Sequence, residues 1–352
     1  MQKVINRFAE AIHTAAADKA PLRLRGGGSK DFYGARLDGR VLDTRAYHGV
    51  VSYEPTELVV TARAGTPLRE LEKTLAQSGQ MLAFEPPHFG PGATVGGCVA
   101  SGLSGPRRAS AGSARDFVLG VRMLDGRGQD LRFGGQVMKN VAGYDLSRLM
   151  TGSLGTLGLL LEVSLKVLPL PKAEVTLRFE ADERSALEKM NQWAGRPLPV
   201  SATCWHEGLL TLRLSGAEAG VRAAREKLGG EEVAGGAEFW ASVREQAHAC
   251  FRGPEPLWRL SLKSAARPLG LPGRQLIEWG GALRWIAGPA PAQQLREAAA
   301  GGGGHATLFR AHDKPASVFH PLPPAAFRLH LRLKQAFDPA GIFNPGRMYE
   351  GF

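Results

Sequence analysis

Residues 89–105 read FGPGATVGGCVASGLSG, with six glycines, small residues at most other positions and no charged side chain. Buried backbone N–H groups need acceptors, so we expect something anionic or carbonyl-rich to lie against this stretch. Two more glycine-rich segments occur in the same half of the chain, RGGGSK at 25–30 and GSLGTLG at 152–158. Three such segments together predict one extended ligand that contains a phosphate.

The first of these segments follows a short strand pattern. Successive glycines after a strand let neighbouring N–H groups converge into an anion-binding nest, although a hairpin turn is an equally simple interpretation. The segment is not a Walker A loop, because Ser29 and Lys30 stand in the wrong order. It also lacks the dinucleotide fingerprint G-x-G-x-x-G, since Gly26 and Gly28 are followed by Asp31 at the last position.

The chain up to Pro169 and Pro171 alternates between helix and strand patterns, which predicts a mixed domain that ends at these prolines. Its expected elements are helices over 3–17 and 67–78, the second with Thr66 as N-cap, a helix start over 139–149, and strands over 21–25, 49–55, 58–65, 117–124, 129–133 and 157–168. The part from 172 to about 312 differs in pattern. Strands over 175–179, 209–214, 257–262 and 306–309 and helices over 185–193 and 217–228 predict an antiparallel sheet covered by helices, folded as a cap.

Composition argues against several classes of protein. Cys98, Cys204 and Cys250 form no C-x-x-C pair, so we expect no disulfide, no metal site and no iron–sulfur ligands within the chain. The net charge of +11 comes from scattered arginines without a basic run, which argues against a nucleic-acid partner. Arg107 and Arg108 are interpreted as solvated charge, with neutralisation of a phosphate as the alternative.

No apolar run reaches the ~20 residues that span a bilayer. The first 20 residues carry charges throughout and predict an amphipathic helix rather than a signal peptide. We therefore expect a cytoplasmic protein, peripheral to the inner membrane only through partner subunits.

Several motifs in a fixed order resemble one family. They are GGGS at 26–29, GATVGG at 92–97, ARDFVLG at 114–120, the run 140–171, FDP at 337–339 and NPGR at 344–347. Together they resemble FAD-binding proteins of the vanillyl-alcohol oxidase and p-cresol methylhydroxylase type, and within that family the short FAD-binding subunits of bacterial glycolate oxidases. The resemblance is dense over 20–171 and resumes from about 335.

The resemblance implies an α+β fold. Residues 1–171 would form an FAD-binding domain of two subdomains, 172–312 a cap with an antiparallel sheet, and 313–352 a C-terminal segment that returns to complete the FAD domain. Some relatives attach FAD through a histidine directly after the glycine run, and Ser29 stands there in this chain. The flavin is therefore expected to be noncovalent.

The resemblance also implies a set of cofactor contacts along the diphosphate, the channel and the adenine. These residues are Gly26, Gly27, Gly28, Ser29, Glu85, Pro86, Thr94, Gly96, Gly97, Ser101, Gly152, Ser153, Gly155, Thr156 and Val163.

Oxidation of a 2-hydroxy acid at a flavin needs a base and a group that binds the carboxylate. The G-D-G-N-x-H and E-H-G motifs of relatives with catalytic caps are absent, and His305 is only a weak candidate for the base, with a polar loop residue as the simpler interpretation. The chain is thus expected to be one subunit of a glycolate oxidase complex. Its partners would be a catalytic flavoprotein subunit that oxidises a small hydroxy acid and an iron–sulfur subunit.

Two other functions stay open. The chain could be a self-sufficient FAD-linked dehydrogenase of a 2-hydroxy acid or alcohol, with His305 or His320 as base. It could also be a scaffold subunit that keeps the fold without the cofactor.

Overall fold

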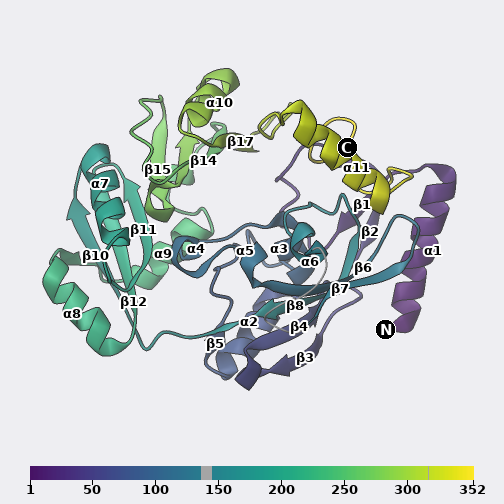
Figure 1. Cartoon of the computed structure of the whole chain (residues 1–352), viewed down its shortest axis with the longest axis horizontal. Helices are drawn as coiled ribbons and strands as arrows, with labels where there is room; N and C mark the ends of the chain where they lie inside the picture. The colour runs from purple at the N-terminus through teal and green to yellow at the C-terminus, as the bar shows by residue number, and fades with distance from the viewer. Residues whose placement is uncertain (136–144, 316) are drawn as a thin grey trace.

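The computed structural model describes residues 1–135, 145–315 and 317–352 and shows an α+β fold. A first set of strands lies beside α1, α2 and α3, and a second, larger sheet follows it in the chain (Figure 1). The described helices are α1 Gln2–Asp18, α2 Leu68–Gln77, α3 Val95–Ser101, α4 Arg108–Ala111, α5 Ala114–Phe117, α6 Leu146–Leu149, α7 Glu183–Ala194, α8 Glu218–Leu228, α9 Gly236–Arg244, α10 Ala292–Gly301 and α11 Pro324–Phe337, with 3-10 turns η1 Pro55–Glu57, η2 Ala249–Phe251 and η3 Trp279–Gly281. The strands are β1 Leu22–Arg25, β2 Arg40–Asp43, β3 Val50–Glu54, β4 Val59–Arg63, β5 Gln80–Met81, β6 Val118–Leu124, β7 Asp130–Gly134, β8 Leu159–Lys166, β9 Leu168–Pro169, β10 Ala173–Glu180, β11 Val200–His206, β12 Leu209–Gly216, β13 Glu231–Glu232, β14 Leu257–Ser261, β15 Arg274–Glu278, β16 Leu283–Ala287 and β17 His305–Arg310.

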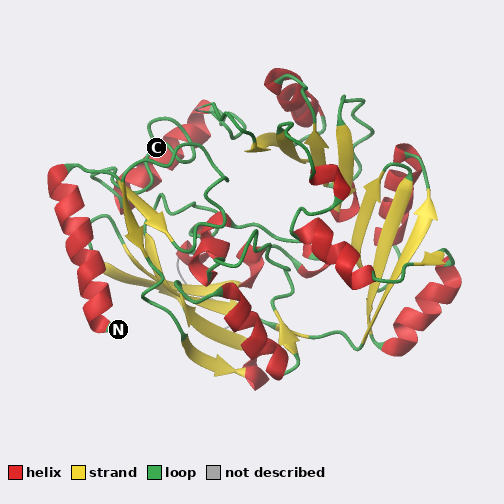
Figure 2. Ribbon diagram, turned by 180° about the vertical axis from the view of Figure 1, so that it is seen from behind, coloured by secondary structure: helices red, strands yellow, loops and turns green. Residues whose placement is uncertain are grey.

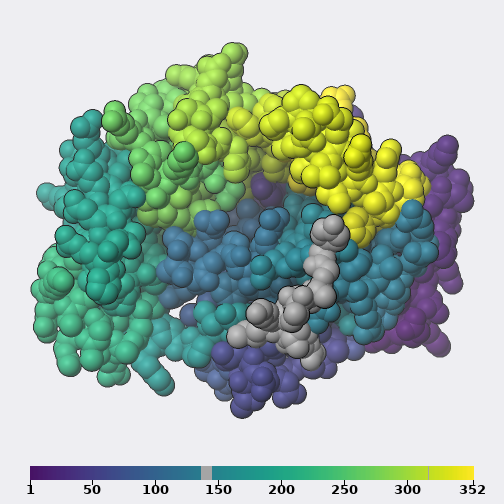
Figure 3. All heavy atoms as spheres, in the orientation of Figure 1, coloured from purple at the N-terminus to yellow at the C-terminus, as the bar shows by residue number. Residues whose placement is uncertain are grey.

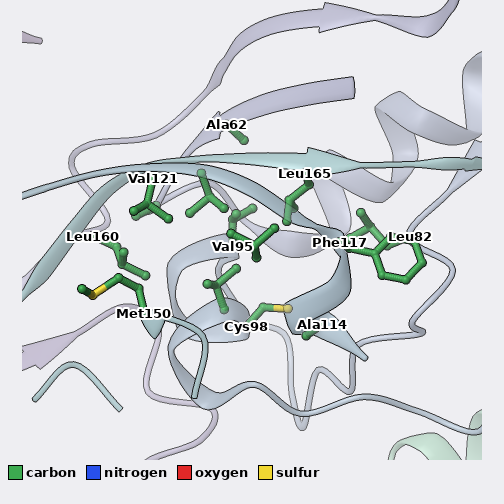
Figure 4. Close-up of a cluster of buried hydrophobic side chains, with 14 of the residues drawn as sticks. Ala62, Leu82, Val95, Cys98, Ala114, Phe117, Val121, Met150, Leu160 and Leu165 are labelled. Carbon is green, nitrogen blue, oxygen red and sulfur yellow. The ribbon is translucent and has the colours of Figure 1, made fainter. Parts of the chain in front are cut away.

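The N-terminal half is built on a five-stranded antiparallel sheet with the order β3-β4-β8-β6-β7. Helix α2 carries leucines three and four residues apart, which places Leu68, Leu71 and Leu75 on one buried face. Val95 and Cys98 of α3 pack among side chains of the sheet (Figure 4). This core holds the glycine-rich stretch that contains α3 against the sheet.

Helix α1 and the C-terminus pack on the small parallel pair β1–β2. The helix buries Ile5, Phe8 and Ile12, whose spacing follows the helical period, in one cluster with Leu22 and Phe343. The last part of the chain therefore lies beside the first strand.

The second sheet is eight-stranded and antiparallel, with the order β13-β10-β12-β11-β15-β16-β14-β17. Helices α7 and α8 cover one part of it through a cluster that includes Leu187, Val221 and Leu212 (Figure 2). A second cluster joins Leu276 and Trp285 of the sheet to side chains of the N-terminal half. The sheet spans 173–310, and the division into 1–171, 172–312 and 313–352 stays a proposal.

Most elements predicted in the N-terminal half are present, with one error of detail. Thr66 was predicted to cap α2, but its hydroxyl accepts the N–H of Gly49 at 2.9 Å, and Pro67 precedes the helix without a side-chain cap. The sequence did not predict β11, β15, β16, α9, α10 or α11. Most of the helix start predicted over 139–149 falls outside the described residues, and α6 lies at its end.

A bilayer-spanning helix would need greater length and more continuous apolarity than any helix found in residues 1–135, 145–315 and 317–352.

Candidate cofactor site

Two adjoining cavities run along the glycine-rich loops. The first measures about 70 Å³ and reaches Gly96 and Gly155. The second measures about 80 Å³ and extends along residues 26–31. Both are lined by Leu24, Arg25, Gly26, Gly97, Ala100 and Leu154. These shared walls make one elongated groove along the three glycine-rich segments.

The loop after β1 exposes its backbone to this groove. A Cβ on Gly27 would come 1.6 Å from the carbonyl oxygen of Gly92, so the two glycine-rich loops touch through their backbones. Gly28 has a φ of +76°, a conformation that side chains rarely adopt. Among the described residues, the N–H groups of Gly27, Gly28 and Ser29 have no acceptor. The loop can therefore donate several N–H groups to an anion, as the nest interpretation expected.

Cationic side chains line the same end of the groove. Arg25 donates from Nε to Asp31 at 2.8 Å, and Arg347 donates from Nη2 to the carbonyl oxygen of Asp31 at 3.0 Å. Burial lowers the pKa of Arg347 to about 10, against the attraction of Asp31. Burial also lowers the pKa of Lys30, which reaches the carbonyl oxygen of His88 at 3.2 Å. Arg25, Lys30 and Arg347, together with the free N–H groups, can supply donors to the two negative charges of a diphosphate.

The stretch 89–105 lies against carbonyl groups, the second of the two kinds of partner expected for it. The N–H of Val95 donates to the carbonyl oxygen of Thr66 at 2.9 Å, that of Gly96 to Ala64 at 2.8 Å, and that of Gly97 to the hydroxyl of Thr94 at 3.2 Å. The carbonyl-rich partner is thus the protein itself, and these amides are not free for an anion. Gly97 and Gly96 instead leave room, because they line the groove without side chains.

The loop 152–158 and the C-terminal tail close the groove. Leu154 lines both cavities and Gly155 the first. Asn344 accepts the N–H of Leu24 at 2.9 Å and donates from Nδ2 to the carbonyl oxygen of Leu154 at 2.7 Å. The tail therefore fixes the strand before the glycine loop and the loop opposite it.

The other residues predicted to contact FAD differ in whether they line the two cavities. Ser101 lines the second cavity, and Thr94 caps α3 beside it. Gly152, Ser153 and Thr156 shape the loop next to Leu154 but do not line either cavity.

Glu85, Pro86 and Val163 lie away from both cavities. Val163 is fully buried in β8. The Glu85 carboxylate accepts the backbone N–H of Arg107 at 2.8 Å and pairs with Arg213 at 2.9 Å. Burial alone would raise the pKa of Glu85, but Arg213 and then Arg107 lower it below its usual range. The cofactor contacts of these three residues stay predictions.

Arg107 also differs from its predicted role as a solvated surface charge. It is 7% exposed and its side chain pairs with Glu85 and Glu174, so it is neither solvated nor free for a phosphate. The two carboxylates come from the loop before the glycine-rich stretch and from β10. Arg107 thus joins the N-terminal half to the second sheet.

The groove-lining residues that sequence reasoning missed include Arg25, Lys30, Leu154, Asn344 and Arg347. The signal for two of them was present, because the NPGR motif at 344–347 was part of the family pattern. Arg25 and Lys30 flank the glycine run that drew attention to the loop.

The weak catalytic candidates lie on the second sheet and its edge. His305 begins the edge strand β17, opposite Ser261, and does not line either cavity. Burial lowers its pKa, and Arg259 and His320 lower it further. In the described parts of the chain, no cluster of three or more histidine, cysteine or carboxylate side chains could hold a metal ion.

Glu278, on β15, is an unusual buried carboxyl that leads to a pH prediction. It is 4% exposed, and burial raises its pKa from 4.5 to about 7, against a hydrogen bond from Nε1 of Trp285 at 2.8 Å. Because the folded pKa exceeds the unfolded one, its contribution to stability is complete below about pH 4.5 and is lost as the pH rises through about 7. The free energy of unfolding of Glu278→Gln relative to the wild type should therefore rise by about 3 kcal/mol from pH 4.5 to pH 8, measured by urea unfolding.

The matched control for this experiment is Glu188→Gln, at an exposed position of α7. Its difference from the wild type should be the same at both pH values. A pH-independent difference for Glu278→Gln as well would show that folding does not raise the pKa of this carboxyl.

Comparisons with known proteins show which cofactor-binding family this chain resembles. Residues 4–134 match the family model described as FAD binding domain. A solved structure of alkyldihydroxyacetonephosphate synthase superposes with a TM-score of 0.65 at 16% identity, over 96% of this chain and 73% of that one, which shows a shared fold. The fold and its FAD-binding domain define an FAD-dependent oxidoreductase.

A relative of similar length identifies the family. The chain is 54% identical over 340 residues to glycolate oxidase subunit GlcE of Escherichia coli (strain K12), which covers 97% of this chain and 96% of that subunit. It therefore belongs to the GlcE family. Over 40% of this chain it is also 33% identical to D-lactate dehydrogenase of Anaerostipes hadrus and 31% identical to glycolate oxidase subunit GlcD of Bacillus subtilis (strain 168), covering 29% of each.

Proposed function

We propose that the chain is the FAD-binding subunit of a glycolate oxidase complex, which oxidises glycolate to glyoxylate and passes electrons to a partner iron–sulfur subunit. The observation that carries this proposal is the 54% identity to GlcE along nearly the whole of both chains. The groove along the glycine-rich loops supports it by supplying the donors that such a cofactor needs.

Different residues of the groove would bind different parts of FAD. The N–H groups of residues 27–29 and the cations Arg25, Lys30 and Arg347 would bind the diphosphate. Gly97 and Ala100 would leave room for the rest of the molecule. Ser29 after the glycine run leaves the flavin noncovalent. Bound FAD would supply the acceptor for the hydrogen removed from the substrate carbon.

The partners follow from what this chain can supply. Cys98, Cys204 and Cys250 are free, buried and distant in sequence, so they cannot provide the four thiolates of an iron–sulfur cluster. The complex therefore needs an iron–sulfur subunit, and a second flavoprotein subunit with its own site for the hydroxy acid. The complex would lie in the cytoplasm and contact the inner membrane through these partners, without a role for nucleic acid.

The proposal is tested by purifying the chain alone and measuring its visible spectrum and FAD content. We expect about one FAD per chain, released on denaturation because the link is noncovalent. Glycolate-dependent dye reduction should be low for the isolated chain and rise when the partner subunits are added. A colourless protein that takes up no added FAD would overturn the cofactor assignment. Rapid bleaching of the flavin by glycolate without partners would favour a self-sufficient dehydrogenase.

A further inference from the structure

One face of the eight-stranded sheet is directed toward the N-terminal half. Cross-strand pairing places Arg259 of β14 opposite Trp285 of β16, which in turn is opposite Leu276 of β15, so the three side chains share a face. Trp285 and Leu276 belong to the same buried cluster as Tyr33 and Leu154 of the N-terminal half. Arg259 is therefore on the inner face of this sheet, among apolar and aromatic side chains.

Arg259 forms no salt bridge there, although the carboxyl of Glu278 lies close enough to interact with it electrostatically. It is half-buried, yet its guanidinium forms no hydrogen bond or ion pair with residues 1–135, 145–315 or 317–352. Other buried arginines of this sheet do have partners. Arg213 pairs with Glu85 at 2.9 Å, and Arg284 donates to the carbonyl oxygen of Arg267 at 2.9 Å. A guanidinium has five N–H donors, and those of Arg259 are left for water or for a bound anion.

A second arginine packs on the same indole as Arg259. The guanidinium carbons of Arg108, on α4, and Arg259 lie 4.6 and 5.3 Å from the ring centre of Trp279. The side chain of Arg108 also has no hydrogen bond or ion pair within the described chain. Burial lowers the pKa of Arg259 and Arg108 lowers it further, while Tyr33 and Glu278 oppose this. Two like charges held beside one indole repel each other unless an anion joins them.

The indole is held firmly in this position. Trp279 donates from Nε1 to the carbonyl oxygen of Gly105 at 3.0 Å and has a φ of +55°, which is unusual for a bulky residue. Its anchor is the loop that leads into α4, so Arg108 and Trp279 are positioned by the same contact. The nearby carboxylate of Glu278 accepts a hydrogen bond from Trp285 and forms no ion pair with either arginine in the described structure.

The two arginines and Trp279 lie next to the groove along the glycine-rich loops. Tyr33, 7% exposed, interacts electrostatically with Arg259, and its hydroxyl has no hydrogen-bond partner among the described residues. Leu154, which lines both glycine cavities, packs in the same cluster as Tyr33 and Trp279. A recess is visible between the green sheet region, the yellow C-terminal segment and the blue central segments, with purple N-terminal atoms at its floor (Figure 3).

We propose that Arg259 and Arg108, together with the hydroxyl of Tyr33, bind the carboxylate of a small organic acid between the eight-stranded sheet and the groove. A planar carboxylate matches the two parallel N–H groups of a guanidinium, and it would relieve the repulsion between the two arginines. This deepens the proposed function, on which it rests for the identity of the acid. It gives this chain an acid-binding site of its own, next to its flavin.

The test is calorimetric titration of the purified FAD-containing chain with oxalate, supported by the fluorescence of Trp279 and the other tryptophans. Wild-type chain should bind one oxalate. Arg259→Met should bind it about 10- to 100-fold more weakly, because charge-assisted hydrogen bonds are lost, and Arg259→Lys should lie between the two. Arg222→Met, at an exposed position of α8, is the matched control and should bind like the wild type. Glycolamide, the neutral amide of glycolate, should not bind.

A second variant tests whether weaker binding could result from misfolding. Arg108→Met should weaken oxalate binding as well, while both variants keep the wild-type circular dichroism and FAD content. Unchanged affinity in Arg259→Met, or tighter binding of inorganic phosphate than of oxalate, would overturn the site. If FAD is bound and oxalate is not, this inference fails while the proposed function stands. If oxalate is bound by a chain that takes up no FAD, the proposed function fails and the acid site stands.

Discussion

Gly97→Val should produce a folded chain that retains less than about a tenth of the FAD bound by the wild type. Gly97 lines both cavities, and a Cβ there would meet only the hydroxyl of Thr94, at 3.2 Å. The valine methyl groups would therefore fill the groove rather than collide with backbone. Valine is also no worse than glycine inside a helix, so α3 should persist. FAD per chain after gel filtration and the FAD dissociation constant measure the effect.

Substitutions at two other glycines serve as comparisons for this experiment. Gly220→Val changes an open position of α8, where no atom lies within 4 Å of the added Cβ, and should keep its flavin. Gly27→Ala places a Cβ 1.6 Å from the carbonyl oxygen of Gly92, so it should lose FAD and stability together. If Gly97→Val binds FAD with unchanged affinity, the cofactor does not occupy this groove.

The sequence predicted those parts of the fold whose signals are local. The apolar spacing of α1 and the hairpin strands predicted over 117–124 and 129–133 are each contained within a few residues. Such signals depend on backbone conformation and helical period, which act over short distances. They correctly indicated a domain of mixed helices and strands and identified the glycine-rich loops, while the α+β fold was implied by the family resemblance.

Strands β15 and β16 were not predicted because their signals are weak. Each has only five residues, and both are surrounded by glycines and prolines that favour turns. Their arginines, Arg274 and Arg284, also interrupt the apolar pattern. Arg284 is tolerated in the interior because carbonyl oxygens from a distant loop accept its N–H groups. Only the folded chain supplies such acceptors.

The site also depends on contacts between distant segments, which the sequence could not predict. The sequence located the glycine loops, but it could not tell that the amides of Gly96 and Gly97 are bonded to neighbouring segments of the protein. Nor could it show that Asn344 binds Leu24 across 320 positions, or that Arg259 and Arg108 meet at Trp279. The sequence shows which residues are small, but the direction of a backbone N–H group or a guanidinium depends on packing between distant segments.

Lys334→Met should lower the free energy of unfolding by about 3–5 kcal/mol. The ammonium of Lys334, on α11, is 6% exposed and lies 2.8 Å from each of three oxygens, the carbonyls of Thr156 and Phe343 and the carboxylate of Asp338. Burial lowers the pKa of Lys334, while Asp338 opposes that effect. Removing the cation leaves a carboxylate that is 1% exposed without its ion pair. Urea unfolding followed by circular dichroism measures the loss.

A double-mutant cycle separates this ion pair from general damage to α11. Arg332→Met, at an exposed position of the same helix, should change stability by less than about 0.5 kcal/mol. Asp338 also accepts the N–H groups of Ile342 and Phe343, so Asp338→Asn should destabilise by itself. The double variant of Lys334 and Asp338 should then lose about 1–3 kcal/mol less than the two single losses added together. Strict additivity would mean that the ion pair adds nothing to stability beyond the separate contributions of Lys334 and Asp338.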